Sequence, residues 1–281
     1  MSAHVLLTGA TGFVGRQILR SLAERGVHVH VVARNGHLPD PAMRSLVETV
    51  IATPDLFAEH ADWWARACAG MEIVVHAAWY AEPGKYLQSP RNTDCLAGTL
   101  ELARGALESR VRRFVGIGSC AEYDCSCGTL STETPLKPDT PYGAAKAAAY
   151  LALSKWLPSE GVELVWCRLF YLYGEGEDPR RLVPHLRTRL AAGEIAELTS
   201  GTQVRDYLDV EEAGRIIADA ALGTVQGAVN VCSGVPTTVR ELAERVADEF
   251  GRRDLLRFGA RGESPFDPPY VVGVPTPLVA A

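Results

Sequence analysis

Short apolar runs alternate with stretches of helical periodicity along the first 168 residues. Six runs have the length and apolar content of buried strands and lie at 5–7, 27–32, 49–52, 72–75, 113–118 and 161–168. Between them, apolar residues recur every three or four positions, for example Ile18, Leu19 and Leu22 before Gly26, and Leu96, Leu100, Ala103 and Leu107 within 92–108. This alternation predicts an α/β fold with a parallel sheet.

Beyond residue 168 the alternation becomes irregular. Residues 169–174 read as an aromatic loop, and helices are expected at 182–190, 211–222 and 239–250 with a strand near 229–231. The residues after Pro268 carry no clear pattern and are expected to be poorly structured. We therefore predict a core at 1–168 that carries the catalytic residues, and a lobe at 169–281. The lobe is interleaved with the end of the core sheet, so the core should include roughly 204–232.

Composition narrows the class of protein. The chain has 281 residues, 47% of them apolar and 22% charged, which suits a globular protein with a large core. A net charge of −6 without a basic stripe argues against nucleic acid as a partner. The apolar runs are too short to span a membrane and no leader pattern is visible, so a cytoplasmic location is expected. Seven cysteines, an odd number, predict free thiols and no metal site, because Cys125 and Cys127 are too closely spaced for zinc.

A glycine-rich turn joins the first strand to the first helix. It spans residues 8–15, and its glycines let the backbone approach a pyrophosphate held at the helix N-terminus. The expected cofactor contacts are Gly9, Thr11, Gly12, Phe13, Val14 and Gly15.

The end of the second strand indicates which dinucleotide is bound. A carboxylate there selects NAD, whereas an arginine accommodates the 2′-phosphate of NADP. This chain has Ala33-Arg34-Asn35, which favours NADP(H) over NAD(H). The alternative is that Arg34 is only a solvated loop residue.

Further candidates follow the third and fourth strands, whose carboxyl ends face the ligand crevice in such sheets. Residues 54–56 are expected to open a helix, where Asp55, beside Leu56, either caps the helix or contacts the adenine. Ala77 and Ala78 are small enough to let a cofactor lie close. Trp79 and Tyr80 are expected to line a substrate pocket, although both could be core residues.

The acid–base candidates are Ser119, Tyr142 and Lys146. Ser119 ends the fifth strand, and the prolines at 138 and 141 place Tyr142 in the first turn of the next helix. Tyr142 and Lys146 lie one helical turn apart, so an ammonium near the phenol is expected to lower the pKa of the tyrosine.

Together these motifs resemble the extended short-chain dehydrogenase/reductase family, in its nucleotide-sugar epimerase, dehydratase and ketoreductase group. Residues 8–15 match its TGxxGxxG turn, Ser119 its serine four before a tyrosine (here Tyr123), and Tyr142 with Lys146 its YxxxK pair. Segments 172–174, 205–210 and 261–263 match further motifs, so the resemblance covers nearly the whole chain. It implies a doubly wound parallel Rossmann sheet with a small C-terminal mixed α/β substrate lobe, a nucleotide-sugar substrate and a homodimer.

The resemblance also implies roles. Tyr142 would exchange a proton with the sugar, Lys146 would bind the nicotinamide ribose, and Ser119 would bind the reacting oxygen. The implied substrate contacts are Trp79, Tyr80, Cys120, Glu122, Tyr171, His185, Arg205 and Arg261. Arg205 could instead pair with Asp206 or Asp209, and His185 could be a surface histidine. The dimer would form through the helices after strands four and five, where Leu96, Leu100, Leu107, Ala147 and Leu151 form apolar stripes.

Departures from the family pattern narrow the chemistry. Family dehydratases carry an Asp-Glu pair after the catalytic residue, and here those places hold Cys120 and Ala121. Glu122 lies one position further and is expected to point away, although it could act as a shifted acid. Cys120 is one residue too early to match the catalytic cysteine of some epimerase/reductases. Cys95 replaces a common asparagine, with Asn92 nearly one turn earlier.

These observations favour an NADP(H)-dependent ketoreductase acting on a nucleotide-linked 4-keto-6-deoxyhexose in deoxysugar biosynthesis. One alternative is a nucleotide-sugar 4-epimerase with tightly held NAD, which would use the same three residues. Another is a non-catalytic NADP(H)-binding sensor or scaffold.

Overall fold

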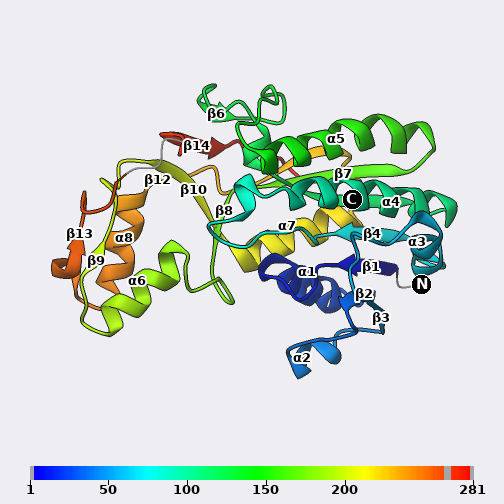
Figure 1. The fold of residues 1–281 in the computed structure, drawn as a ribbon, viewed down its shortest axis with the longest axis horizontal. Coiled ribbons are helices and arrows are strands. Elements are labelled where there is room, and N and C mark those ends of the chain that lie inside the picture. Colours follow the sequence, from blue (N-terminus) through cyan, green and yellow to red (C-terminus); the bar gives the residue numbers. More distant parts are fainter. Residues whose placement is uncertain (1–2, 263–266, 279–281) are drawn as a thin grey trace.

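The computed structural model describes residues 3–262 and 267–278, and its centre is a seven-stranded sheet (Figure 1). The strand order is β11-β7-β5-β4-β1-β2-β3, and every pairing is parallel. The strands are β1 (His4–Thr8), β2 (His28–Arg34), β3 (Thr49–Thr53), β4 (Ile73–His76), β5 (Arg113–Ser119), β7 (Glu163–Leu169) and β11 (Gly227–Val231). The order reverses between β1 and β4, where doubly wound sheets bind ligands.

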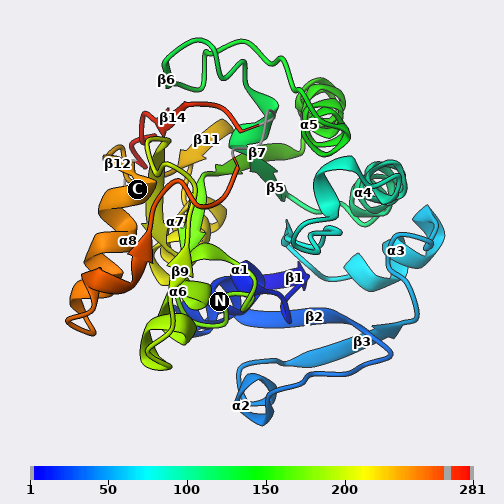
Figure 2. The same ribbon diagram turned by 60° about the vertical axis from the view of Figure 1, so that its left-hand side comes forward.

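Helices cover both faces of this sheet. One face packs against α1 (Phe13–Glu24) and α7 (Val210–Leu222). The other packs against α3 (Ala61–Cys68), α4 (Arg91–Glu108) and α5 (Pro141–Ser159), which lie in a row in Figure 2. A short helix, α2 (Pro41–Arg44), follows β2. The predicted α/β class and doubly wound sheet are therefore confirmed.

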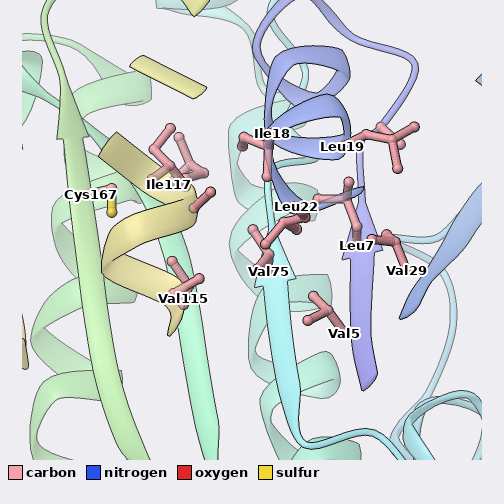
Figure 3. Close-up of a cluster of buried hydrophobic side chains, with 14 of the residues drawn as sticks. Val5, Leu7, Ile18, Leu19, Leu22, Val29, Val75, Val115, Ile117 and Cys167 are labelled. Carbon is pink, nitrogen blue, oxygen red and sulfur yellow. The ribbon is translucent and has the colours of Figure 1, made fainter. Parts of the chain in front are cut away.

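Alternation along β1 shows why its apolar run is continuous. Val5 and Leu7 point to the α1 side, where they meet Ile18 and Leu22 (Figure 3). Leu6 points to the opposite side and joins the core beneath α3 and α4. A strand buried on both faces needs apolar residues at every position.

The second part of the chain forms a smaller lobe, seen at the left of Figure 1. Its core lies between α6 (Leu182–Ala191) and α8 (Val239–Asp248), beside the strand pair β9 (Ala196–Glu197) and β13 (Leu256–Arg257). A five-stranded sheet adjoins it. Its strands are β6 (Thr129–Leu130), β8 (Tyr171–Tyr173), β10 (Val204–Asp209), β12 (Pro236–Thr238) and β14 (Tyr270–Gly273). Three 3₁₀ turns complete the elements: η1 (Tyr86–Gln88), η2 (Cys120–Glu122) and η3 (Arg253–Leu255).

Several expected elements were wrong. The aromatic loop at 169–174 contains β8, and the segment after Pro268 contains β14, because both strands pair with β10. No helix opens at 54–56: α3 begins at Ala61, and Asp55 accepts a hydrogen bond from the Phe57 amide (3.0 Å) within a turn. Within 204–232, α7 and β11 belong to the core, whereas β10 lies in the second sheet.

Two further expectations can be compared with the described residues. All seven cysteines are free, and no described helix is long and apolar enough to cross a membrane.

The leucine stripe of α4 is half-buried against its own core, and Ala147 is buried as well. Leu151 on α5 is 55% exposed, so it alone of the proposed dimer stripe presents a large apolar surface.

Close contact between α3 and α4 depends on Gly105, which gives a stability prediction. A Cβ at this position would lie 2.4 Å from Trp64 Cβ and 2.6 Å from the Ala65 amide nitrogen. Gly105→Ala should therefore lower the free energy of unfolding by about 1–3 kcal/mol, despite the better helix propensity of alanine. Chemical denaturation measures this. The control Arg104→Ala removes an exposed side chain from the same helix and should change stability by less than about 0.5 kcal/mol. An unchanged or stabilised Gly105→Ala variant would contradict the packing described.

Candidate active site

The glycine turn packs directly under the end of β4. Gly9 has φ +74°, and a Cβ there would lie 2.6 Å from the Ala78 nitrogen, so only glycine fits without strain. A Cβ at Gly15 would lie 2.0 Å from the Gly9 oxygen. The turn leads into α1, whose N-terminal residue Gly12 offers no side-chain cap and whose first turn has no acidic residue. Its amides are therefore free to bind an anion.

A groove of about 660 Å³ runs along the carboxyl ends of β1 to β4. The predicted cofactor residues that line it are Gly9, Thr11, Gly12, Arg34, Asp55, Leu56, Ala77 and Ala78. Phe13, Val14 and Gly15 form the first turn of α1 behind it and are not in its lining. A long groove centred on an anion-binding turn fits a dinucleotide. Arg34 is exposed at the β2 end, beside His37, which the sequence did not single out.

Ser119 and Tyr142 come together at the junction of β5 and α5. Thr140 caps α5 by accepting from the Gly143 amide (3.1 Å), and Pro141 starts the helix, so Tyr142 lies in the first turn as predicted. A Cβ at Gly143 would lie 2.2 Å from the Ala121 oxygen, so glycine lets α5 begin against η2. The Ser119 hydroxyl lies close enough to the Tyr142 phenol to lower the pKa of the phenol. Two groups that can donate to one substrate oxygen are thus adjacent.

Lys146 is buried one turn further along α5. Its ammonium donates to the Ile117 carbonyl of β5 and lies 3.8 Å from the centroid of the Trp79 ring. Burial lowers the pKa of Lys146 to about 7, while the charges of Glu122 and Cys95 act in the opposite direction. The lysine therefore loses its proton far more easily than an exposed one.

The expected lowering of the Tyr142 pKa by lysine was wrong for this structure. Burial raises the pKa of Tyr142, and Tyr86 raises it further, while the hydrogen bond from Ser119 only partly offsets this. The Tyr86 ring meets the Tyr142 ring edge-on, with centroids 4.8 Å apart. The Lys146 ammonium is engaged by the Ile117 carbonyl and the Trp79 ring instead.

Aromatic residues from the loop after β4 surround this centre. Trp79 lines the dinucleotide groove, and its indole donates to the Asn92 side chain (2.9 Å), so its place in a substrate pocket stays a prediction. The Tyr80 side chain has other partners. Its hydroxyl donates to Glu82 (3.0 Å), and the Arg91 guanidinium lies 4.8 Å from its ring centroid. Sequence reasoning missed Tyr86, because the short η1 turn that carries it has no periodic pattern.

Arg205 on β10 and Tyr171 on β8 form a second group of side chains in the five-stranded sheet. Arg205 is 2% exposed, pairs with Asp267 and lies 5.1 Å from the centroid of the Tyr171 ring. The two carboxylates considered as its partners have other roles. Asp206 accepts from Ser233, Gly234 and Gly273, and Asp209 caps α7.

The residues after Ser119 do not supply a second acid. Burial raises the pKa of the Cys120 thiol, which keeps it protonated. Glu122 is fully buried and pairs with Arg168 (2.7 Å), so its predicted contact with substrate was wrong. The reason is local: residues 120–122 form a 3₁₀ turn rather than a strand, so the carboxylate folds back beneath Ser119.

His185 and Arg261 both belong to the lobe. His185 is half-buried on α6, and burial together with the charges of Arg261 and Arg189 lowers its pKa. Arg261 is exposed. Among the described residues, no cluster of three or more acidic, histidine or cysteine side chains is placed to hold a metal ion.

Comparison with known proteins agrees with this geometry. The sequence model of the NAD dependent epimerase/dehydratase family matches residues 5–232. The chain belongs to this family. That explains the coexistence of the glycine turn, the strand-end serine and the Tyr-x-x-x-Lys pair in one sheet, and it makes the chain one of a group of NAD-dependent enzymes of nucleotide sugars.

Individual relatives differ in reaction. The dTDP-6-deoxy-L-talose 4-dehydrogenase (NAD(+)) of Aggregatibacter actinomycetemcomitans is 23% identical, covering 88% of this chain and 90% of its own. The dTDP-glucose 4,6-dehydratase of Streptomyces niveus is 28% identical, covering 90% and 80%. Among solved structures, the UDP-glucose 4-epimerase of Thermotoga maritima with UDP-glucose has TM-score 0.84 at 21% identity, covering 97% and 90%. The chain is thus similar to a dehydrogenase, a dehydratase and an epimerase, and it shares the fold of the epimerase structure.

Burial of Lys146 predicts a pH-dependent cost in stability. The pKa falls from 10.5 to about 7 on folding, so between these values the unfolded chain binds a proton that the folded chain does not. Raising the pH through this window therefore stabilises the wild type, and below it the full cost of burying the charge remains. Lys146→Met should be more stable than the wild type by a few kcal/mol at about pH 6, and this advantage should shrink towards about pH 9.

Thermal unfolding at both pH values measures this effect. Lys155→Met provides the matched control, because Lys155 is exposed on the same helix and should show no such pH dependence. A Lys146→Met advantage that is equal at both pH values would contradict the burial of a titrating amine.

Proposed function

We propose that this enzyme uses NADP(H) to reduce the 4-keto group of a nucleotide-linked 4-keto-6-deoxyhexose in deoxysugar biosynthesis. The proposal is carried by the Ser119 and Tyr142 hydroxyls, which come together where β5 ends and α5 begins, beside a dinucleotide groove. Two neighbouring hydroxyls can both donate to a single oxygen, as reduction of one carbonyl requires.

Ser119, Tyr142 and Lys146 have separate roles in this reduction. Reduced NADP supplies hydride chemistry when bound in the groove. Ser119 donates a hydrogen bond to the keto oxygen and fixes its position. Tyr142, whose pKa is raised, holds its proton firmly until charge develops on that oxygen and then delivers it. Lys146 and the Trp79 ring against it close the inner wall of the site.

The same residues argue against dehydration as the reaction. Elimination of water from a hexose needs an acid and a base in addition to the tyrosine. Ala121 has no functional group, Cys120 keeps its proton, and the Glu122 carboxylate is bound by Arg168. Tyr142 is left as the acid–base group, which suits transfer of one proton and one hydride at one carbon.

Arg34 supports the preference for NADP(H). It lines the groove at the end of β2, is exposed, and has no neighbouring carboxylate among the groove residues of β2. A guanidinium binds a phosphate dianion through two parallel hydrogen bonds, whereas a ribose hydroxyl would gain little from it. On the lobe side, His185 and Arg261 are the proposed contacts to the nucleotide, and Leu151 fits the proposed homodimer face of α5.

Tyr142→Phe tests the catalytic assignment. The variant keeps the ring but loses the proton, so kcat should fall by roughly 100-fold or more, with NADPH affinity nearly unchanged. Oxidation of NADPH is followed by absorbance with the dTDP- and UDP-linked 4-keto-6-deoxyhexoses. Tyr80→Phe is the control, because its hydroxyl bonds Glu82 outside the centre. Unchanged turnover in Tyr142→Phe would remove the assignment. NAD bound at stoichiometry, with no NADPH consumed, would favour the 4-epimerase.

Arg34→Asp tests the cofactor preference. It places a carboxylate where the 2′-phosphate would bind, so the NADPH-to-NADH ratio of kcat/KM should drop by about tenfold or more. Arg66→Ala, an exposed arginine on α3 outside the groove, is the control and should leave the ratio unchanged. A ratio that does not respond to Arg34→Asp would show that Arg34 is only solvated.

A further inference from the structure

A carboxylate lies directly beneath the reactive serine. The Glu122 side chain has no exposed surface, and its oxygens accept from the Ser119 amide (2.8 Å), the Trp166 indole (3.0 Å) and the Arg168 guanidinium (2.7 Å). Ser119 in turn accepts from the Ala121 amide, so the two residues form a reciprocal capping box around η2. The position of the Ser119 backbone is therefore tied to the carboxylate.

Two glycines of β5, the strand that ends at Ser119, leave room for the Glu122 carboxylate. A Cβ at Gly118 would lie 2.4 Å from the Glu122 carboxylate and 2.3 Å from the Trp166 indole nitrogen. A Cβ at Gly116 would lie 2.2 Å from the Trp166 ring. Neither glycine has an unusual φ, so backbone geometry does not explain them. Their lack of side chains makes the space in which Glu122 and Trp166 fit.

Arg168, which forms the ion pair with Glu122, has further contacts with Tyr123 and Tyr150. The Arg168 guanidinium lies 4.5 Å from the Tyr123 ring centroid and 4.4 Å from that of Tyr150. It also donates to the Tyr123 hydroxyl (2.9 Å), which donates to Asn230 (2.6 Å). Burying both charges costs several kcal/mol of desolvation, and an apolar pair of the same volume is often as stable. Stability alone therefore gives little reason for the pair.

We propose that Glu122 is a positioning residue for the reaction centre, which holds the Ser119 backbone so that its hydroxyl meets both Tyr142 and the substrate oxygen. Arg168 is its counter-ion, and Trp166 fixes the rotation of the carboxylate. The proposal rests on the proposed function only for its catalytic consequence, since the hold on Ser119 is a property of the folded chain.

Glu122 also contributes an electric field at the centre. Its charge raises the pKa of Lys146 and of Tyr142. The other groups facing Lys146 are Cys95 from α4 and His76 from β4, and those facing Tyr142 are Tyr86 from η1 and Cys120 from η2. Removing the Glu122 charge should therefore lower both values, so the pH profile of kcat in Glu122→Gln should move to lower pH.

The decisive variant is the double replacement Glu122→Leu with Arg168→Met. It removes both charges together, so no buried charge is left unpaired and the protein should fold, with a stability lowered by about 1–3 kcal/mol for each of the two buried donors, the Ser119 amide and the Trp166 indole, that lose their acceptor. The Ser119 amide loses its acceptor, and kcat for the 4-keto-6-deoxyhexose should fall by about tenfold or more, with KM within about threefold. Glu163→Gln is the matched control. It neutralises the ion pair with Arg113 at the opposite end of β5 and β7 and should leave kcat and its pH profile unchanged.

A second measurement needs no turnover. Hydrogen exchange of the Ser119 amide, followed by NMR, should be slow in the wild type and in Glu163→Gln, and at least about tenfold faster in the double variant. Slow exchange that persists in the double variant overturns the proposal, as does a wild-type kcat in a stable double variant. If the wild type reduces no 4-keto sugar but the exchange follows Glu122, the proposed function fails and the hold on Ser119 stands.

Discussion

The hydrogen bond from Lys146 to the Ile117 carbonyl sets the geometry on which the rest of the site depends. This bond fixes the position of α5 along β5. The two proposed reacting side chains, Ser119 and Tyr142, come from these two elements, one from each. Tyr142 is one helical turn before Lys146, and Ser119 is two residues beyond Ile117. The same ammonium also packs against the face of the Trp79 ring. A single buried amine therefore aligns a helix, a strand and the wall of the cofactor groove, at the cost of a lowered pKa.

The central sheet could be predicted because most of its strands contain a run of apolar residues. Strands buried on both faces and separated by amphipathic helices leave a local signal, as at β1 and α1. The second sheet leaves no such signal. β6 and β14 span 2 and 4 residues, and they form because β6 pairs with β14, which in turn pairs with β10. Pairing between distant segments does not show in local periodicity, so the end of the chain looked unstructured.

The site was predictable in its residues and less so in its electrostatics. Spacing and strand ends singled out Ser119, Tyr142 and Lys146 as candidates, and the structure places all three where β5 meets α5, because their positions depend on single elements. The raised pKa of Tyr142 comes from burial and, after that, from Tyr86, which belongs to a different loop. The role of Glu122 depends on Arg168, 46 residues later, and on glycines that make space for it. Burial and partners of this kind arise from tertiary packing, which one sequence does not reveal.

The central claim is that hydride and proton go to one carbonyl carbon and its oxygen, with net oxidation of the cofactor. The most direct measurement uses NADPH deuterated at both nicotinamide C4 positions together with a nucleotide-linked 4-keto-6-deoxyhexose, and reads the product by mass spectrometry and NMR. We expect one deuterium at sugar C4 and one NADP⁺ formed per product. An epimerised or dehydrated sugar without deuterium, formed while NADPH is not consumed, would contradict it.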